Sequence, residues 1–188
     1  MAFLSKAFVA CVLFGPIGLA IEQPPADARF IQEAARTSIF EIQMGELAQL
    51  RSSSDQVKQY GIRMASDYGT ILEQLSSIAA KSNFALPGDM GPHNQSIMDL
   101  LTEISGPVPL SEPAFDQVYI GEIIGAHKMD IAAFREESAS GSTADLREFA
   151  ASAVPVMEEH LRLARAAEND LGSLSQVVEK NKQASAQW

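Results

Sequence analysis

Apolar side chains recur every three or four residues in four long stretches of the chain, the spacing typical of helices that bury one face. These stretches are Asp27–Leu50, Asp55–Asn83, Pro113–Ser138 and Ser142–Gly172. Short breaks rich in serine and glycine separate the first stretch from the second and the third from the fourth. Because such short breaks join neighbouring helices, the pattern predicts two antiparallel helical hairpins. The alternating pattern of a strand is absent, so the predicted class is all-α.

The segment that joins the two hairpins has a different pattern. Phe84–Pro113 contains eight glycines and prolines, which interrupt helices, and one short amphipathic piece at Asn94–Ser105. A helix of about 26 residues is about 39 Å long, and a connector of this size can run back along that length. The sequence therefore predicts a four-helix bundle with one long crossover that contains a short helix, which is the ferritin-like arrangement. A plain up-down-up-down bundle is the alternative.

The first twenty residues have the pattern of a secretory signal. Lys6 is their only charge, Ala7–Leu19 is almost wholly apolar, and small residues flank Leu19. An uncleaved N-terminal anchor is the alternative. The predicted organisation is a signal peptide at 1–20, a linker at 21–27, the bundle at 28–172 with its crossover at 84–113, and a polar tail at 173–188. A periplasmic or cell-envelope location follows from this prediction.

The charge and the cysteine content of the chain exclude some classes of protein. The chain has 14 basic and 24 acidic residues, for a net charge of -10, and its single cysteine, Cys11, lies inside the predicted signal. An acidic chain without a basic cluster is a poor nucleic-acid binder, and one cysteine builds no disulfide framework. The partners that the sequence leaves open are an envelope protein, a membrane surface and a metal ion, and it assigns no oligomeric state.

Each long stretch carries one ionisable residue within its apolar stripe, and these four are Glu41, Asp67, His127 and His160. A charge buried in such a stripe needs a partner. One interpretation is an internal polar network in which each histidine is satisfied. Another is a carboxylate and histidine site for a single transition metal ion or a small ligand. A third, acid–base catalysis, lacks a nucleophile–base pair, so no catalytic or cofactor-binding residue is assigned.

The residues that precede each histidine, and the levels of the four ionisable residues along the bundle, help to choose among these interpretations. A ferritin-like di-iron site needs a Glu-x-x-His pair on each of two helices, but Ile124 and Met157 stand three residues before the histidines. If the chain reverses direction at position 140.5, residues equally far from that position lie at the same level on the two helices of the second hairpin. His160 then lies about 9 Å along the helix axis from the level of His127. The same estimate for the first hairpin places Asp67 about 4.5 Å along the axis from the level of Glu41. We therefore expect a carboxylate pair in one hairpin and two separate imidazoles in the other. A non-enzymatic bundle with a buried polar seam is favoured, and a metal- or small-ligand-binding bundle is the alternative.

Several motifs, taken in order, resemble those of a known family. They are Phe30 with Ala34-Ala35, Glu41 with Gly45-Glu46-Leu47-Ala48, Val57-Lys58 through Met64 to Asp67, Ala114-Phe115-Asp116 with Tyr119, Ala126-His127, and Pro155 followed by His160 and Ala164. Over Phe30–Ala167 the chain resembles the bacterial envelope domain-of-unknown-function family 4142, whose members are labelled membrane or outer-membrane proteins.

This resemblance implies a ferritin-like bundle and an envelope location, and it implies no activity. The family usually has Asp-His where this chain has Asp67-Tyr68. A metal site that used that histidine would lack a ligand here.

Overall fold

The computed structural model describes residues 26–81, 84–104 and 113–185, with side chains for 26–81, 84–103 and 115–172. This part of the chain is helical, and its helices are α1 (Ala26–Arg51), α2 (Asp55–Lys81), α3 (Gly91–Ile104), α4 (Pro113–Ser140) and α5 (Ala144–Ser185). The all-α prediction is confirmed. The predicted signal peptide and residues 21–25 of the predicted linker lie outside the described residues, and the last two linker residues, Ala26 and Asp27, belong to α1. Within the described residues, no helix is both long enough and apolar enough to cross a membrane.

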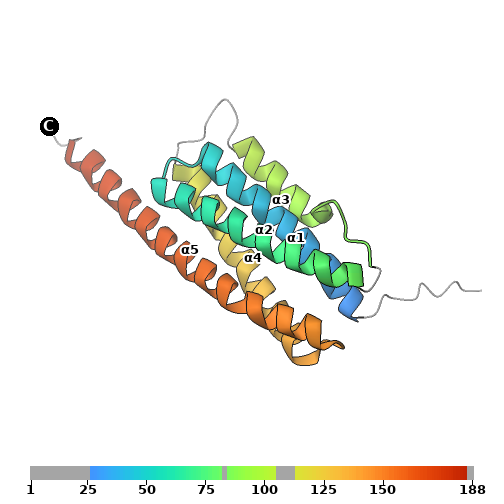
Figure 1. Cartoon of the computed structure of the whole chain (residues 1–188). Coiled ribbons are helices and arrows are strands. Elements are labelled where there is room, and N and C mark those ends of the chain that lie inside the picture. The colour runs from blue at the N-terminus through green and yellow to red at the C-terminus, as the bar shows by residue number, and fades with distance from the viewer. Residues whose placement is uncertain (1–25, 82–83, 105–112, 186–188) are drawn as a thin grey trace, which may run out of the picture.

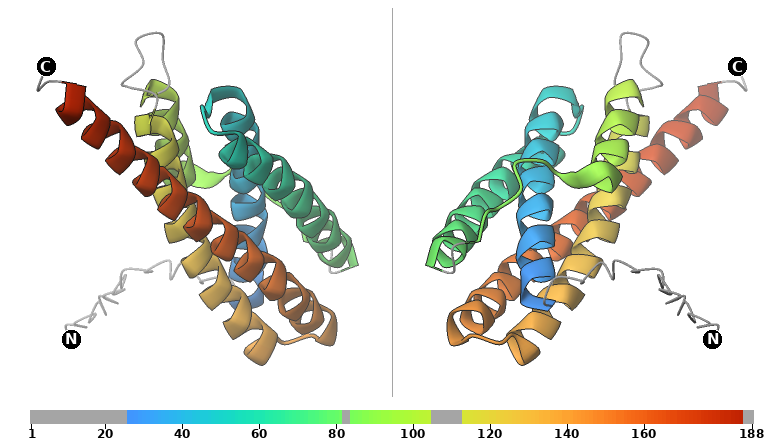
Figure 2. Two further views of the ribbon diagram at one scale, coloured as in Figure 1. Left: turned by 90° about the vertical axis from the view of Figure 1, so that its left-hand side faces the viewer. Right: turned by 90° about the vertical axis from the view of Figure 1, so that its right-hand side faces the viewer.

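The helices form two antiparallel hairpins that pack side by side (Figure 1). Packing is most extensive within each hairpin, between α1 and α2 and between α4 and α5, whereas α1–α4 and α2–α5 contacts join the hairpins. Helix α3 packs on α1 and α4, outside the four long helices (Figure 2). Helix α4 begins at the same end of the bundle as α2, so the connection crosses its full length. The predicted single crossover is therefore confirmed, and the plain up-down-up-down alternative is not.

Hydroxyl side chains begin two of the long helices. Ser54 Oγ accepts a hydrogen bond from the backbone N–H of Val57 at 3.4 Å, and Thr143 Oγ1 accepts one from Leu146 at 3.2 Å. Each satisfies a helix-start donor that would otherwise lack a partner. Asp27 lies in the first turn of α1 and accepts a hydrogen bond from the N–H of Ser142 at 3.1 Å. It thereby links the start of α1 to the turn between α4 and α5.

Two glycines bring the backbones of α1 and α2 into direct contact. A Cβ atom at Gly45 would lie 2.4 Å from the carbonyl oxygen of Gly61, and one at Gly61 would lie 2.6 Å from the carbonyl oxygen of Gly45. A side chain larger than hydrogen therefore does not fit at either position. This close approach lies one helical turn from Glu41 and fixes α1 against α2 beside the candidate site.

The last helix is longer than predicted. Helix α5 continues through the predicted polar tail to Ser185, and its end projects beyond the other helices (Figure 1). The tail contains Leu174, Val177 and Val178 at spacings that allow the helix to continue. The short helix predicted within the crossover is confirmed as α3, which begins at Gly91 with a φ of 78°.

Candidate functional site

Three of the four ionisable residues predicted to face inward meet in the middle of the bundle, and the fourth reaches them from its edge. Glu41, His127 and His160 are fully buried, whereas the side chain of Asp67 is 33% exposed at the edge between α2 and α5. The rings of His127 and His160 are neighbours, with centroids 5.5 Å apart. The ring of Tyr68 contacts both, with its centroid 5.8 Å from that of His127 and 5.7 Å from that of His160.

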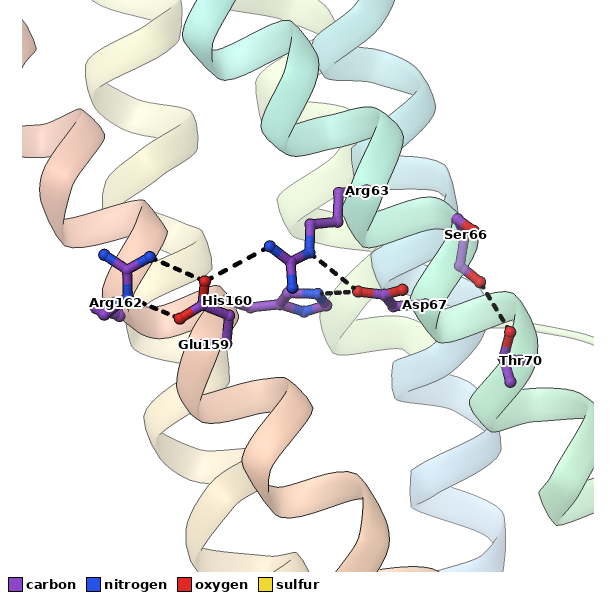
Figure 3. Close-up of polar contacts among 7 residues, drawn as sticks. All are labelled: Arg63, Ser66, Asp67, Thr70, Glu159, His160 and Arg162. Atoms are coloured by element: carbon purple, nitrogen blue, oxygen red, sulfur yellow. Dashed lines mark hydrogen bonds and ion pairs between the residues drawn. The ribbon is translucent and has the colours of Figure 1, made fainter.

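One carboxylate–histidine pair joins α2 to α5. His160 Nε2 lies 2.8 Å from Asp67 Oδ2 (Figure 3). Arg63 lies beside this pair, with Nε 3.4 Å from Asp67 Oδ2 and Nη1 3.5 Å from Glu159 Oε1. Because a carboxylate oxygen only accepts, Nε2 of His160 carries the hydrogen and Nδ1 is left with a lone pair. The exposed edge of the site is thus a charged network, while the imidazole itself is buried.

The other pair joins α1 to α4 and is looser. His127 Nδ1 lies 3.6 Å from Glu41 Oε1, which is too long for a hydrogen bond, and 3.0 Å from the carbonyl oxygen of Ile123. Since a carbonyl oxygen only accepts, Nδ1 donates to Ile123, and Nε2 of His127 keeps the lone pair. Both imidazoles are therefore held in a defined tautomer by one partner each.

Burial keeps the centre of the site uncharged. Loss of solvation is the main cause that lowers the pKa of His127 to about 3, and the nearby His160 lowers it further. Burial likewise lowers the pKa of His160, although Asp67 opposes that shift. Burial, reinforced by the charge of Asp130, raises the pKa of Glu41 well above its ordinary value. Charged forms are disfavoured in this core, so near neutral pH both imidazoles are neutral.

Asp130 extends the site toward the surface beside α3, and sequence analysis did not identify it. Burial raises the pKa of Asp130 to about 7, an effect that the nearby hydroxyls of Tyr68 and Thr37 oppose. Neither Asp130 Oδ2 nor the hydroxyl of Tyr68 has a partner at ordinary hydrogen-bond geometry among the described residues. Asp130 follows His127 by three residues, one helical turn, and that spacing was the available signal. We use the name polar seam for the six residues Glu41, Asp67, Tyr68, His127, Asp130 and His160.

The structure corrects the predicted pairing of the four residues. Glu41 and Asp67 each contact a histidine of the other hairpin, so two carboxylate–histidine pairs replace the predicted carboxylate pair. The imidazoles are also closer than predicted. Helix α4 ends at Ser140 and α5 begins at Ala144, so the hairpin turns about position 142. This shift puts His160 only about 4.5 Å along the axis from the level of His127.

The donor set of the polar seam differs from that of a di-iron centre. Neither histidine belongs to a Glu-x-x-His pair, so the residues present do not fit two iron ions. Across the described ranges, no group of three or more histidine, cysteine, aspartate or glutamate side chains is placed to hold a metal ion. What the seam does offer is His127 Nε2 and His160 Nδ1, two buried nitrogens that have no hydrogen-bond partner among the described residues.

The buried neutral imidazoles predict a loss of stability in acid. A histidine whose pKa is lower in the folded state stabilises the fold above its unfolded pKa of 6.5, and that contribution is lost as the pH falls toward 3. We expect His127→Gln to remove this proton uptake. Urea unfolding at pH 7.5 and pH 4.5 should show a loss of stability smaller by roughly 2.7 kcal/mol than in the unmodified protein. His93→Gln, an exposed position on α3, serves as the control. An unchanged pH dependence in His127→Gln would contradict a neutral, buried His127.

The fold and its core define a class of protein, a ferritin-like helical bundle. Among solved structures, the chain is similar to the crystal structure of the E. coli stress protein YciF, with a TM-score of 0.52 and 15% sequence identity. The match covers 81% of this chain and 95% of that one. At this identity the similarity supports the fold alone.

The particular family follows from the sequence. A family model described as a domain of unknown function, DUF4142, matches residues 19–167, and the chain belongs to this family. The resemblance seen in the sequence is thereby confirmed. The comparison with curated proteins found no match.

Proposed function

We propose that this protein is a non-enzymatic bundle of the bacterial cell envelope that binds one transition metal ion between His127 and His160. The export part of the proposal is supported by the first twenty residues, in which an apolar run follows the single charge of Lys6 and ends at small residues. The binding part is supported by the arrangement of the two imidazoles.

The observation that carries the proposal is the hydrogen-bonding state of the two rings. Metal-binding histidines commonly donate one ring N–H to a carboxylate or a backbone carbonyl, which fixes the ring and leaves the other nitrogen for the metal. His160 has this arrangement with Asp67, and His127 has it with the carbonyl of Ile123. The remaining nitrogens are buried and lack partners among the described residues, and the rings are 5.5 Å apart.

The chemistry of these donors favours one class of ion. Imidazole nitrogens suit the late first-row metals, and affinity for such donors is greatest for copper(II), with zinc(II) and nickel(II) below it. Glu41, fully buried with its Oε1 atom 3.6 Å from His127 Nδ1, supplies a carboxyl group that can ionise to balance part of a cation's charge. Asp67 would act through His160 and not as a ligand, because its Oδ2 already accepts from Nε2.

Metal titration of chelator-treated protein tests the proposal. We expect copper(II) sulfate or zinc chloride to raise the melting temperature, with saturation at one ion per chain. At a free metal concentration of about 100 times Kd, the stabilisation should be about 2.7 kcal/mol, which is roughly 5–10 °C for a domain of this size.

Two variants make the result specific. His127→Gln should lose the rise in melting temperature, whereas His93→Gln, at an exposed histidine, should keep it. No rise with either metal, or an equal rise in His127→Gln, would overturn the proposal. The polar seam would then be a purely structural network that joins the two hairpins.

A further inference from the structure

A pocket of about 470 Å³ lies between α1, the start of α3 and α4. Its walls include Phe40, Met90, Ala126 and Met129, so most of its surface is apolar. Asp130 also lines it, as the half-buried carboxyl group that connects the pocket to the polar seam. Ligand sites in proteins typically combine this volume and apolar lining with a few placed polar groups.

The charges around the pocket favour a cation. Arg36 lies at the rim, but its guanidinium is already paired with Glu33 at 3.0 Å and with Asp89 at 3.5 Å. Asp89 Oδ1 also accepts a hydrogen bond from the N–H of Gly91 at 2.8 Å, so it occupies the positive end of α3. Arg36 is thus outnumbered by nearby carboxylates even before Asp130 is included.

The carboxyl group of Asp130 has unused bonding capacity. Its Oδ2 atom is buried and lacks a hydrogen-bond partner among the described residues. A buried acceptor without a partner is costly, and a ligand that donates a charged hydrogen bond to it, once the carboxyl group turns to present this oxygen to the pocket, would recover that cost. The surrounding methionines and Phe40 favour an apolar or aromatic body, because thioether sulfur makes favourable contacts with aromatic rings.

We propose that this pocket binds a small amphipathic primary amine, whose ammonium group is held by Asp130 and whose apolar body packs against Phe40, Met90 and Met129. The site is separate from the histidine pair, and this proposal does not depend on metal binding. An ammonium group provides three donors, so it suits a carboxylate flanked by the hydroxyls of Thr37 and Tyr68.

Three ligands of similar shape and different charge test the proposal in calorimetric titrations of the full chain. We expect 2-phenylethylamine to bind, with 2-phenylethanol and 3-phenylpropionate binding at least tenfold more weakly. Backbone amide NMR spectra should show the amine's largest shifts at Phe40, Met129 and Asp130. Equal binding of the alcohol, preferred binding of the carboxylate, no binding of the amine, or shifts elsewhere would each overturn the proposal.

Charge-removing variants locate the anchoring group. Asp130→Asn should weaken amine binding at least tenfold while keeping the fold, because it replaces a buried carboxyl group with a neutral side chain of the same shape. Asp99→Asn makes the same change at an exposed position of α3 outside the pocket and should leave affinity unchanged. Undiminished binding by a folded Asp130→Asn protein would show that Asp130 does not hold the amine.

Discussion

Replacing Gly45 with alanine is expected to lower the free energy of unfolding by about 3 kcal/mol, the upper part of the range for overpacked cores. The added Cβ would lie 2.4 Å from the carbonyl oxygen of Gly61 and 3.0 Å from the Cβ of Ala65. The nearest atom belongs to the backbone of a helix and cannot rotate away as a flexible side chain can. The hairpin would have to separate, and its core packing would be lost along with the close approach of α1 and α2.

Gly69→Ala, in α2 of the same hairpin, provides the matched control. A Cβ at Gly69 meets no atom within 4 Å, and alanine is the better helix former by about 1 kcal/mol. Urea unfolding should therefore show opposite signs for the two substitutions, a loss for Gly45→Ala and a small gain for Gly69→Ala. Two stability changes of the same sign and size would mean that the contact with Gly61 does not set the packing of this hairpin.

Replacing His160 with alanine is expected to cost about 3 kcal/mol of stability for two reasons. The change removes a fully buried ring and leaves a cavity in the centre of the bundle. It also removes the hydrogen bond of 2.8 Å to Asp67, which links α2 to α5. Thermal and urea unfolding at pH 7.5 measure this loss, which should appear as a melting temperature lower by roughly 6–12 °C.

A double-mutant cycle separates the hydrogen bond from the cavity. Asp67→Asn, His160→Gln and the double variant keep the side chains close to their original volumes, so the coupling energy reports the Asp67–His160 contact. His93→Ala, which alters an exposed histidine, should change stability by less than about 0.5 kcal/mol. If His160→Ala were as mild as His93→Ala, the position of His160 in the core would be incorrect.

The sequence predicted the helices well because local features set their limits. The serine and glycine breaks placed the ends of three long helices within about three residues of those observed, which is within the usual uncertainty of such boundaries. The proline and glycine positions of the crossover also showed where the short helix α3 would lie. The end of α5 was missed because a polar surface does not prevent a helix from continuing when no glycine or proline stops it after Gly172.

The candidate site was only partly predictable. Periodicity identified Glu41, His127 and His160 as inner residues, and all three are fully buried. It could not assign their partners, because the side of a helix that faces a particular neighbour depends on how the hairpins pack. An error of 1.5 residues in the turn between α4 and α5 was enough to add about 4.5 Å to the predicted axial separation of the two imidazoles. Asp130 lies beside the apolar stripe and not within it, so the stripe gave no indication of its burial.

The position of the polar seam between the hairpins has a consequence for folding kinetics. Contacts within α1–α2 and within α4–α5 are close in sequence, and elements built from such contacts form quickly. The Asp67–His160 hydrogen bond and the Glu41–His127 contact form only when the two hairpins dock, since each joins one hairpin to the other. We therefore expect these polar groups to lose their bound water in the step in which the two hairpins dock. Substitutions that remove their polar atoms should then alter the rate of docking, whereas substitutions at Gly45 should act earlier, when the first hairpin forms.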